Sequence, residues 1–146
     1  MFKHILVPTD GSKLSQDTVA RAVSFAREIG AGVTFFYAEH EMPVAYDGLA
    51  ISHEHLTQEA HQRLDGAAAE ILDDAQQVAQ KGGVKAKRLI LVGNSPAALI
   101  IEAAESSNCD LIFMASHGRK GVSALLLGSE TSKVLTHSKI PVLVYR

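Results

Sequence analysis

The chain alternates between short apolar runs and longer segments in which apolar residues recur every three or four positions. Short apolar runs are typical of buried strands, and the three-to-four spacing is typical of helices with one face toward a core. Two helical segments stop at glycines, where helices commonly end. The pattern predicts strands at residues 5–7, 33–38, 84–92, 110–115 and 140–145, with helices ending at Gly30 and Gly82, a third starting at Pro96 and a fourth over 129–137.

Strands and helices therefore follow one another in regular alternation. Strands that are almost wholly apolar need cover on both faces, and strand–helix–strand connections place the strands parallel. We expect an α/β fold with a doubly wound, parallel, five-stranded sheet and helices on both faces. The strand at 84–92 mixes Lys and Arg with apolar residues at its start, which is typical of an exposed sheet edge. A length of 146 residues fits a single domain over residues 1–146.

Composition narrows the possible partners. Apolar residues make up 47% of the chain and charged residues 21%, a balance typical of globular proteins. The formal net charge is −2 and basic residues are scattered, so we expect no nucleic-acid surface. No apolar run approaches the roughly 20 residues that span a bilayer, and the first strand is too short for a signal sequence. Cys109 is the only cysteine, which suits a cytoplasmic protein without disulfides.

A glycine-rich loop between residues 115 and 129 follows the apolar run 110–114. Gly118 and Gly121 lack the Cβ atoms that would block close backbone approach, and Arg119 and Lys120 supply positive charge. Gly128 and Ser129 then open a helix with free N–H donors. Such donors at the carboxyl end of a buried strand can hold phosphate, so the loop predicts a nucleotide phosphate site. The alternative is an ordinary connection in which Ser129 caps the helix.

Three segments together resemble the nucleotide-binding class of universal stress proteins. They are ILVPTDGS at residues 5–12, GNSP at 93–96, and the stretch from MASHG at 114–118 through GS at 128–129 to PVLV at 141–144. The likeness spans essentially the whole chain and implies an adenine nucleotide α-hydrolase-like fold. The family's phosphate motif is glycine, two residues, glycine, nine residues, then glycine with serine or threonine. Gly118, Gly128 and Ser129 match its later part.

Ala115 stands where the motif has its first glycine. In an ordinary extended backbone the additional methyl group is harmless, whereas at a positive φ it would weaken binding. Because Ala115 ends a predicted strand, we expect the harmless case.

The resemblance implies that ATP binds with its phosphates on the loop and on the N-terminus of the last helix. Pro8, Thr9 and Ala38 would line the adenine side, and Asp10 would bond the ribose or help hold a phosphate-bound Mg²⁺. Asp10 has a second interpretation, because an Asp-Gly turn with Ser12 or Ser15 as the helix cap needs no ligand. The full set of candidate nucleotide-binding residues is Pro8, Thr9, Asp10, Ala38, Met114, Ser116, His117, Gly118, Arg119, Gly121, Gly128, Ser129 and Glu130.

Catalytic machinery is not evident in the sequence. Neither the P-loop pattern nor the Gly-x-Gly-x-x-Gly turn occurs, and His117 has no nucleophile and base near it in the sequence. We therefore name no catalytic residue and expect at most slow ATP hydrolysis, or self-phosphorylation on Ser129 or Ser116. Glu130 would repel phosphate if it pointed inward, although Lys133 and the loop cations can offset it.

Histidines 53, 55 and 61 lie close together but lack the i, i+4 spacing of a helical metal site. They are interpreted as helix surface.

The strand at 140–145 is an expected sheet edge, and in the resembled family two copies pair through this strand. The sequence thus favours a cytoplasmic, ATP-binding regulatory homodimer of the stress response, with unknown protein partners. The alternatives are a slow ATPase or self-phosphorylating enzyme, and a dimeric interaction module without nucleotide.

Overall fold

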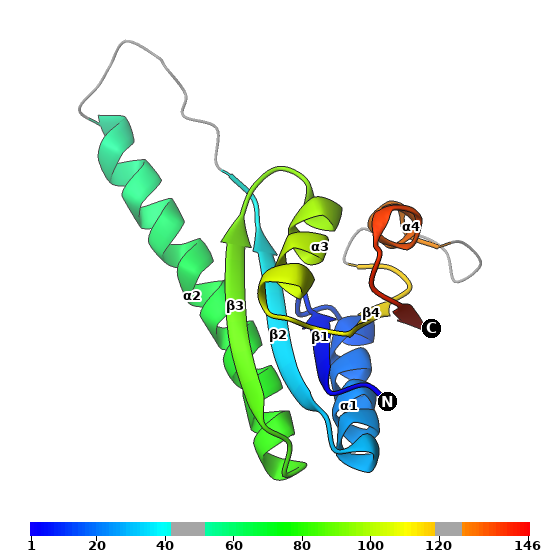
Figure 1. Ribbon diagram of the computed structural model, residues 1–146. Coiled ribbons are helices and arrows are strands. Elements are labelled where there is room, and N and C mark those ends of the chain that lie inside the picture. Colours follow the sequence, from blue (N-terminus) through cyan, green and yellow to red (C-terminus); the bar gives the residue numbers. More distant parts are fainter. Residues whose placement is uncertain (42–51, 119–126) are drawn as a thin grey trace.

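The computed structural model describes residues 1–41, 52–118 and 127–146, with the side chains of 52–64 outside the description. Figure 1 shows a central sheet with helices packed along it. In chain order the elements are β1 (His4–Pro8), α1 (Lys13–Ile29), β2 (Gly32–Glu39), α2 (Ser52–Lys81), β3 (Ala86–Val92), α3 (Pro96–Ser106), β4 (Leu111–Ala115), α4 (Ser129–His137) and β5 (Val142–Tyr145).

The five strands form one parallel sheet in the order β3-β2-β1-β4-β5. This confirms the expected doubly wound fold and places β3 and β5 at the two edges. Three strands begin later than expected, and the smallest shift is in β4, which starts at Leu111 instead of Asp110. β3 starts at Ala86 because Val84 is still in the connection, where its N–H bonds the Ala79 carbonyl, and β5 starts only after Pro141.

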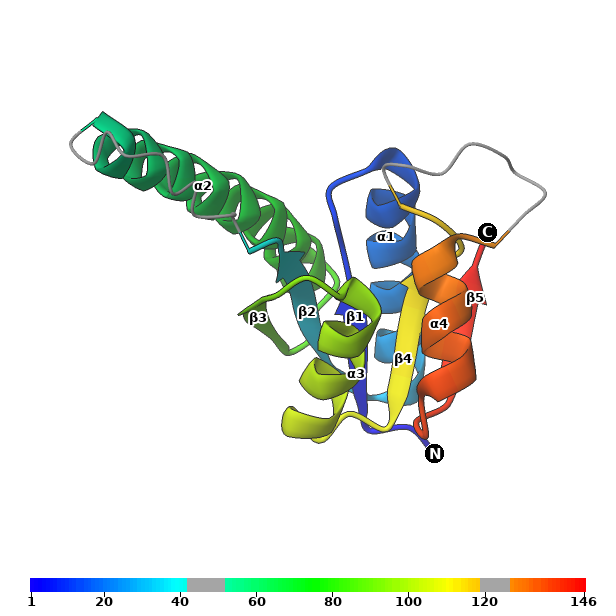
Figure 2. The same ribbon diagram turned by 90° about the horizontal axis from the view of Figure 1, so that it is seen from above.

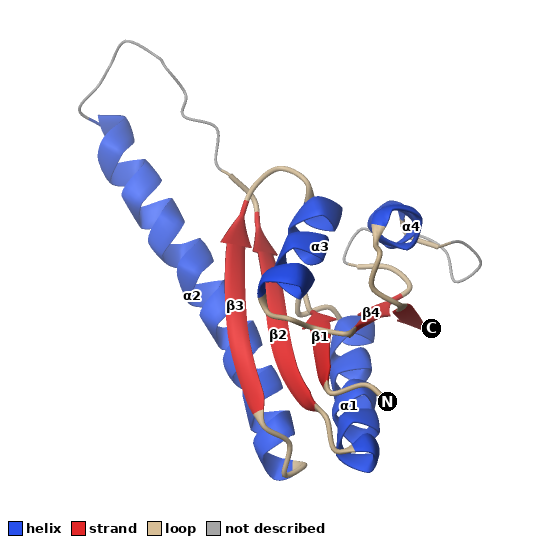
Figure 3. Cartoon of the chain, viewed as in Figure 1, coloured by secondary structure: helices blue, strands red, loops and turns tan. Residues whose placement is uncertain are grey.

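Two hydrophobic cores lie on opposite faces of the sheet. Val7 and Phe35 pack with residues of α1 and α2 on one face, while Phe36 and Met114 pack with residues of α3 and α4 on the other. The two helix layers are visible in Figure 2, and the sheet between them in Figure 3. Alternate side chains of a strand point to opposite faces, so each fully apolar strand supplies both cores.

The strand order creates a switch point beside β1. From β1 the chain moves through α1 to β2 on one side, whereas β4 lies on the other side of β1. The connections after β1 and β4 therefore leave toward opposite helix layers and open a crevice at their carboxyl ends. Among the helices that the structure describes, none combines the length and the apolar character needed to cross a bilayer.

Candidate functional site

The crevice brings Asp10, which follows β1, against Gly118, which follows β4. A Cβ built on Gly118 would lie 2.5 Å from Asp10 Oδ2, closer than real Cβ contacts allow. Only glycine fits at position 118 without moving the carboxylate. The tertiary structure thus places Asp10 next to the start of the glycine loop.

The segment that carries Asp10 is held firmly to the start of α1. Asp10 Oδ1 accepts the Ser12 N–H at 2.9 Å, and the Asp10 N–H donates to Ser15 Oγ at 3.1 Å. Ser12 is the N-cap of α1, with its Oγ accepting the Ser15 N–H at 3.3 Å, and Gly11 takes the positive φ of 77° that the turn requires. The Asp-Gly turn with Ser12 as the helix cap is therefore present, and Asp10 Oδ2 lies on the side of Gly118.

The two ends of the glycine loop meet at the carboxyl end of β4. The Gly128 N–H donates to the Ser116 carbonyl at 2.8 Å, and the buried Thr131 hydroxyl lies 3.1 Å from both the Ala115 and Ser116 carbonyls. A Cβ on Gly128 would lie 3.2 Å from His117 Cα and from the Ser116 oxygen. Glycine at 128 thus permits this closure, which fixes the first turn of α4 beside the crevice.

Helix α4 begins at Ser129 with Gly128 as its N-cap, so Ser129 is not the cap that the simpler interpretation of the loop assigned. The N–H of Gly128 itself is engaged by Ser116. In any α-helix the N–H groups of the first turn have no carbonyl partner within the helix, and the helix dipole makes this end positive. Ser129 is exposed, and it and the following N–H groups lie at the positive end of α4.

Ala115 has an ordinary extended backbone. It is the last residue of β4 and pairs with Tyr145 of β5. Among the described non-glycine residues, only Asn108 has a positive φ. The methyl group at 115 therefore costs no backbone strain, as expected.

Four of the candidate nucleotide-binding residues divide between the two faces of the sheet. Met114 is buried on the α3/α4 face, where Ala38 packs against the same core. Pro8 lies level with Phe36 in the sheet register and so shares that face. Thr9 is different, because its buried hydroxyl bonds Ser15 Oγ at 2.5 Å on the α1 side.

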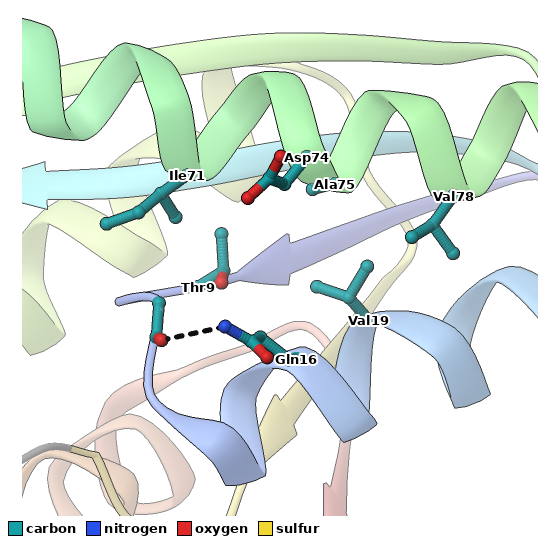
Figure 4. A pocket seen from close by; sticks show the side chains of 8 residues that line it. Thr9, Gln16, Val19, Ile71, Asp74, Ala75 and Val78 are labelled. Atoms are coloured by element: carbon teal, nitrogen blue, oxygen red, sulfur yellow. Dashed lines mark hydrogen bonds between the residues drawn. The ribbon is translucent and has the colours of Figure 1, made fainter.

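Thr9 lines a cavity of about 220 Å³ between α1 and α2. Val19 of α1 and Val78 of α2 supply apolar walls, and Asp74 contributes a carboxylate (Figure 4). Gln16 bridges the mouth by donating from Nε2 to the Gly11 carbonyl at 3.2 Å. The β1–α1 segment therefore separates this cavity from the crevice that Asp10 and Gly118 form.

Glu130 points toward α3. Its Oε2 accepts the Ala97 N–H at 2.7 Å, and its Oε1 pairs with Lys133 Nζ at 2.9 Å. Burial would raise the pKa of Glu130, but the hydrogen bonds from Lys133 and Ala97 hold it below its ordinary value. The Ala97 contact was not predicted from the sequence, because no local pattern connects residues 33 positions apart.

The remaining candidate residues are His117, the loop residues after it and the three histidines near residue 55. His117 Nδ1 lies 3.2 Å from the buried Ser116 Oγ, so the imidazole lies against the start of the glycine loop. Arg119, Lys120 and Gly121 lie outside the described residues, as do the side chains of histidines 53, 55 and 61. Within the part of the chain that is described, no three metal-ligating side chains converge.

An open α/β sheet with a glycine-lined crevice at its switch point defines a class of ligand-binding domains. Comparison with known proteins identifies the family. The model of the universal stress protein family matches residues 1–146. Universal stress protein MJ0531 of Methanocaldococcus jannaschii is 32% identical over 146 residues, which cover 100% of this chain and 83% of that protein. The chain belongs to the universal stress protein family.

Solved structures agree with this assignment. Protein MJ0577 of the same archaeon superposes with a TM-score of 0.81 at 30% identity, over 99% of this chain and 95% of that one. A universal stress protein solved in complex with cAMP superposes with a TM-score of 0.73 at 26% identity, over 99% of this chain and 97% of that one. The resemblance inferred from the three sequence segments is therefore confirmed.

Proposed function

We propose that this single-domain protein binds ATP in the crevice between β1 and β4 and acts as a nucleotide-dependent regulatory protein of the stress response. The observation that carries the proposal is the contact between Gly118 and Asp10. A Cβ at 118 would require the Asp10 carboxylate to move, so a bare glycine backbone here lies beside Asp10 at the start of the loop that leads to the N-terminus of α4. Bare backbone and a positive helix end are the elements that bind phosphate.

Each part of an adenine nucleotide has proposed partners at this end of the sheet. Ser129 and the following N–H groups would take the phosphates, together with Gly118 and the loop residues Arg119 and Gly121. Asp10 would take the ribose, and the Pro8, Ala38 and Met114 group would face the base. The cAMP complex of a 26% identical relative supports an adenine ligand.

Mg²⁺ would enter with the phosphates. Magnesium bound to nucleotides is commonly held by one or two carboxylates plus phosphate oxygens, so a complete protein cage is not required. Asp10, with Oδ2 beside Gly118, is the carboxylate suited to this role.

A homodimer through β5 is the proposed assembly. β5 is an edge strand whose residues 142–145 are all only half-buried, and a sheet edge offers N–H and C=O groups for pairing. Sedimentation equilibrium is expected to give twice the mass of the chain. Slow amide exchange at 142–145 that is lost on dilution would place the interface there. The lone buried Cys109 is consistent with a reducing cytoplasm.

The direct test is isothermal titration calorimetry with ATP and Mg²⁺, set beside cAMP, AMP and GTP. Nucleotide released from heat-denatured purified protein and identified by chromatography gives an independent measure. Tighter binding of ATP than of GTP supports the proposal. If AMP or cAMP binds and ATP does not, the ligand is that nucleotide and not ATP. A flat titration with every adenine nucleotide at millimolar concentration would refute it.

A further inference from the structure

One side chain joins the N-termini of α3 and α4 at the carboxyl edge of the sheet. Glu130 lies in the first turn of α4, and its Oε2 accepts the N–H of Ala97 in the first turn of α3 at 2.7 Å. The carboxylate oxygens face a donor on each side, because Oε1 pairs with Lys133 at 2.9 Å. A single residue thus links two segments that are far apart in sequence.

The contact supplies a side-chain acceptor for the N-terminus of α3. Ser95 occupies the N-cap position but makes no side-chain cap hydrogen bond, and Pro96 has no N–H to satisfy. Ala97 therefore supplies the first N–H of the helix, and the acceptor for it comes from another helix. A carboxylate at a helix N-terminus is also favoured by the helix dipole.

The same turn of α4 forms the anion-binding end of the crevice. Thr131, the next residue after Glu130, holds this turn against the carbonyls at the end of β4. Glu130 holds it from the opposite direction against α3. With Gly128 closing the loop on Ser116, the N–H groups of Ser129 and Glu130 are fixed between two supports.

The orientation of Glu130 also matters for charge. A carboxylate in the first turn of α4 would repel phosphate if it faced the crevice, since like charges at close range disfavour binding. Both of its oxygens are instead engaged by Ala97 and Lys133. The side chain of Glu130 therefore bonds α3 and Lys133. Its backbone N–H is one of the first-turn N–H groups of α4, which point out of the N-terminal end of the helix.

We propose that Glu130 is a positioning residue of the nucleotide site: by bonding the Ala97 N–H it holds the first turn of α4 where its N–H groups meet the phosphates. This inference rests on the proposed function, because it concerns the same crevice. The inference adds that the affinity for phosphate depends on the hydrogen bond between Glu130 and Ala97, although neither of these groups would contact the phosphate.

The test compares Glu130→Ala with Glu130→Gln, using calorimetry with ATP, AMP and adenosine at a temperature where each variant is folded. An amide oxygen can still accept the Ala97 N–H, so Glu130→Gln is expected to stay within about twofold of the wild type, whereas Glu130→Ala should lose about five- to tenfold in ATP affinity. Adenosine has no phosphate, so its affinity should not change in either variant. Glu102→Ala, on the exposed face of α3, is the matched control.

Four results would overturn the inference. If both Glu130 variants bind ATP more tightly than the wild type, the residue acts only as a nearby negative charge. If Glu130→Ala melts at a lower temperature but binds ATP normally when folded, its role is purely structural. If the wild type binds no adenine nucleotide, the proposed function itself fails and this inference fails with it. Normal wild-type binding with an unaffected Glu130→Ala variant rejects the positioning role alone.

Discussion

Asp10 and Gly118 lie so close together that a Cβ on Gly118 would meet Asp10 Oδ2 at 2.5 Å. The two residues come from the ends of β1 and β4, which are neighbours in the sheet although more than half the chain separates them. This proximity joins the carboxyl ends of β1 and β4, and the first prediction depends on it.

Gly118→Ala is expected to weaken ATP binding by about tenfold or more, because its methyl group must push the Asp10 carboxylate aside. Calorimetry gives the affinity, and circular dichroism verifies that the variant is folded. Gly66→Ala is the matched control, since a Cβ at that position in α2 meets no atom within 4 Å. Equal ATP affinity in Gly118→Ala and the wild type would remove the crevice from consideration as the phosphate site.

Thr131→Val is expected to lower the free energy of unfolding by about 1–2 kcal/mol, because the buried hydroxyl donor to the end of β4 is replaced by a methyl group. Urea denaturation measures the change. Thr136→Val serves as the control, since the exposed Thr136 hydroxyl bonds only the Ser132 carbonyl of its own helix. A similar loss in both variants would mean that the closure of the glycine loop does not stabilise the fold.

Acid should destabilise the protein partly through Asp110. Burial would raise the pKa of Asp110, but hydrogen bonds from the His4 and Lys3 N–H groups hold it below its ordinary value of 3.8. A carboxylate with a lowered pKa stabilises the fold above its unfolded pKa and loses that contribution as the pH falls through the folded one. The free energy of unfolding, measured by denaturant titration, should therefore fall less steeply between pH 5 and pH 2 in Asp110→Asn than in the wild type. Parallel curves for the variant and the wild type would contradict this.

His4 extends the acid sensitivity to higher pH. Burial and the nearby Lys87 lower the pKa of His4 below 6.5, although the Asp110 charge opposes them. The unfolded chain therefore binds a proton at His4 more readily than the folded one, so stability is fully present above about pH 6.5 and decreases below it. An NMR titration of the imidazole should give a midpoint below 6.5, and a midpoint above that value would reverse the sign of the effect.

Cys109 should react slowly with thiol reagents in the native protein. Burial, with a smaller contribution from the Asp110 charge, raises the pKa of the Cys109 thiol to about 12. The thiol stays protonated in the fold, and a protonated thiol is a poor nucleophile. Labelling with iodoacetamide at pH 8 should be fast in urea and slow without it. Equal rates would show that the thiol is accessible in the native state.

The same shift predicts a loss of stability in alkali. Above pH 9 the unfolded thiol ionises first, so the contribution of Cys109 to stability is present below pH 9 and decreases as the pH rises toward 12. Cys109→Ala should flatten the alkaline part of the curve of unfolding free energy against pH. An unchanged curve would assign that loss to other groups.

The sequence by itself determined the fold class and the location of the crevice. Fully apolar runs such as residues 5–7 need cover on both faces, and their alternation with helical spacing leaves a parallel, doubly wound sheet as the solution. The expected extended backbone at Ala115 was also accessible from the sequence, because position within a strand fixes φ locally.

Only the tertiary structure decided where several side chains act. Thr9 turns to the α1 side and bonds Ser15, Gly128 replaces Ser129 as the cap of α4, and Glu130 reaches across to Ala97 of α3. In each case the deciding partner belongs to a neighbouring element, which the local sequence pattern does not specify. The spacing of apolar residues along the sequence reflects secondary structure and the core, so it can be used for prediction. The direction of a polar side chain depends on which hydrogen-bond partner the fold brings within about 3 Å.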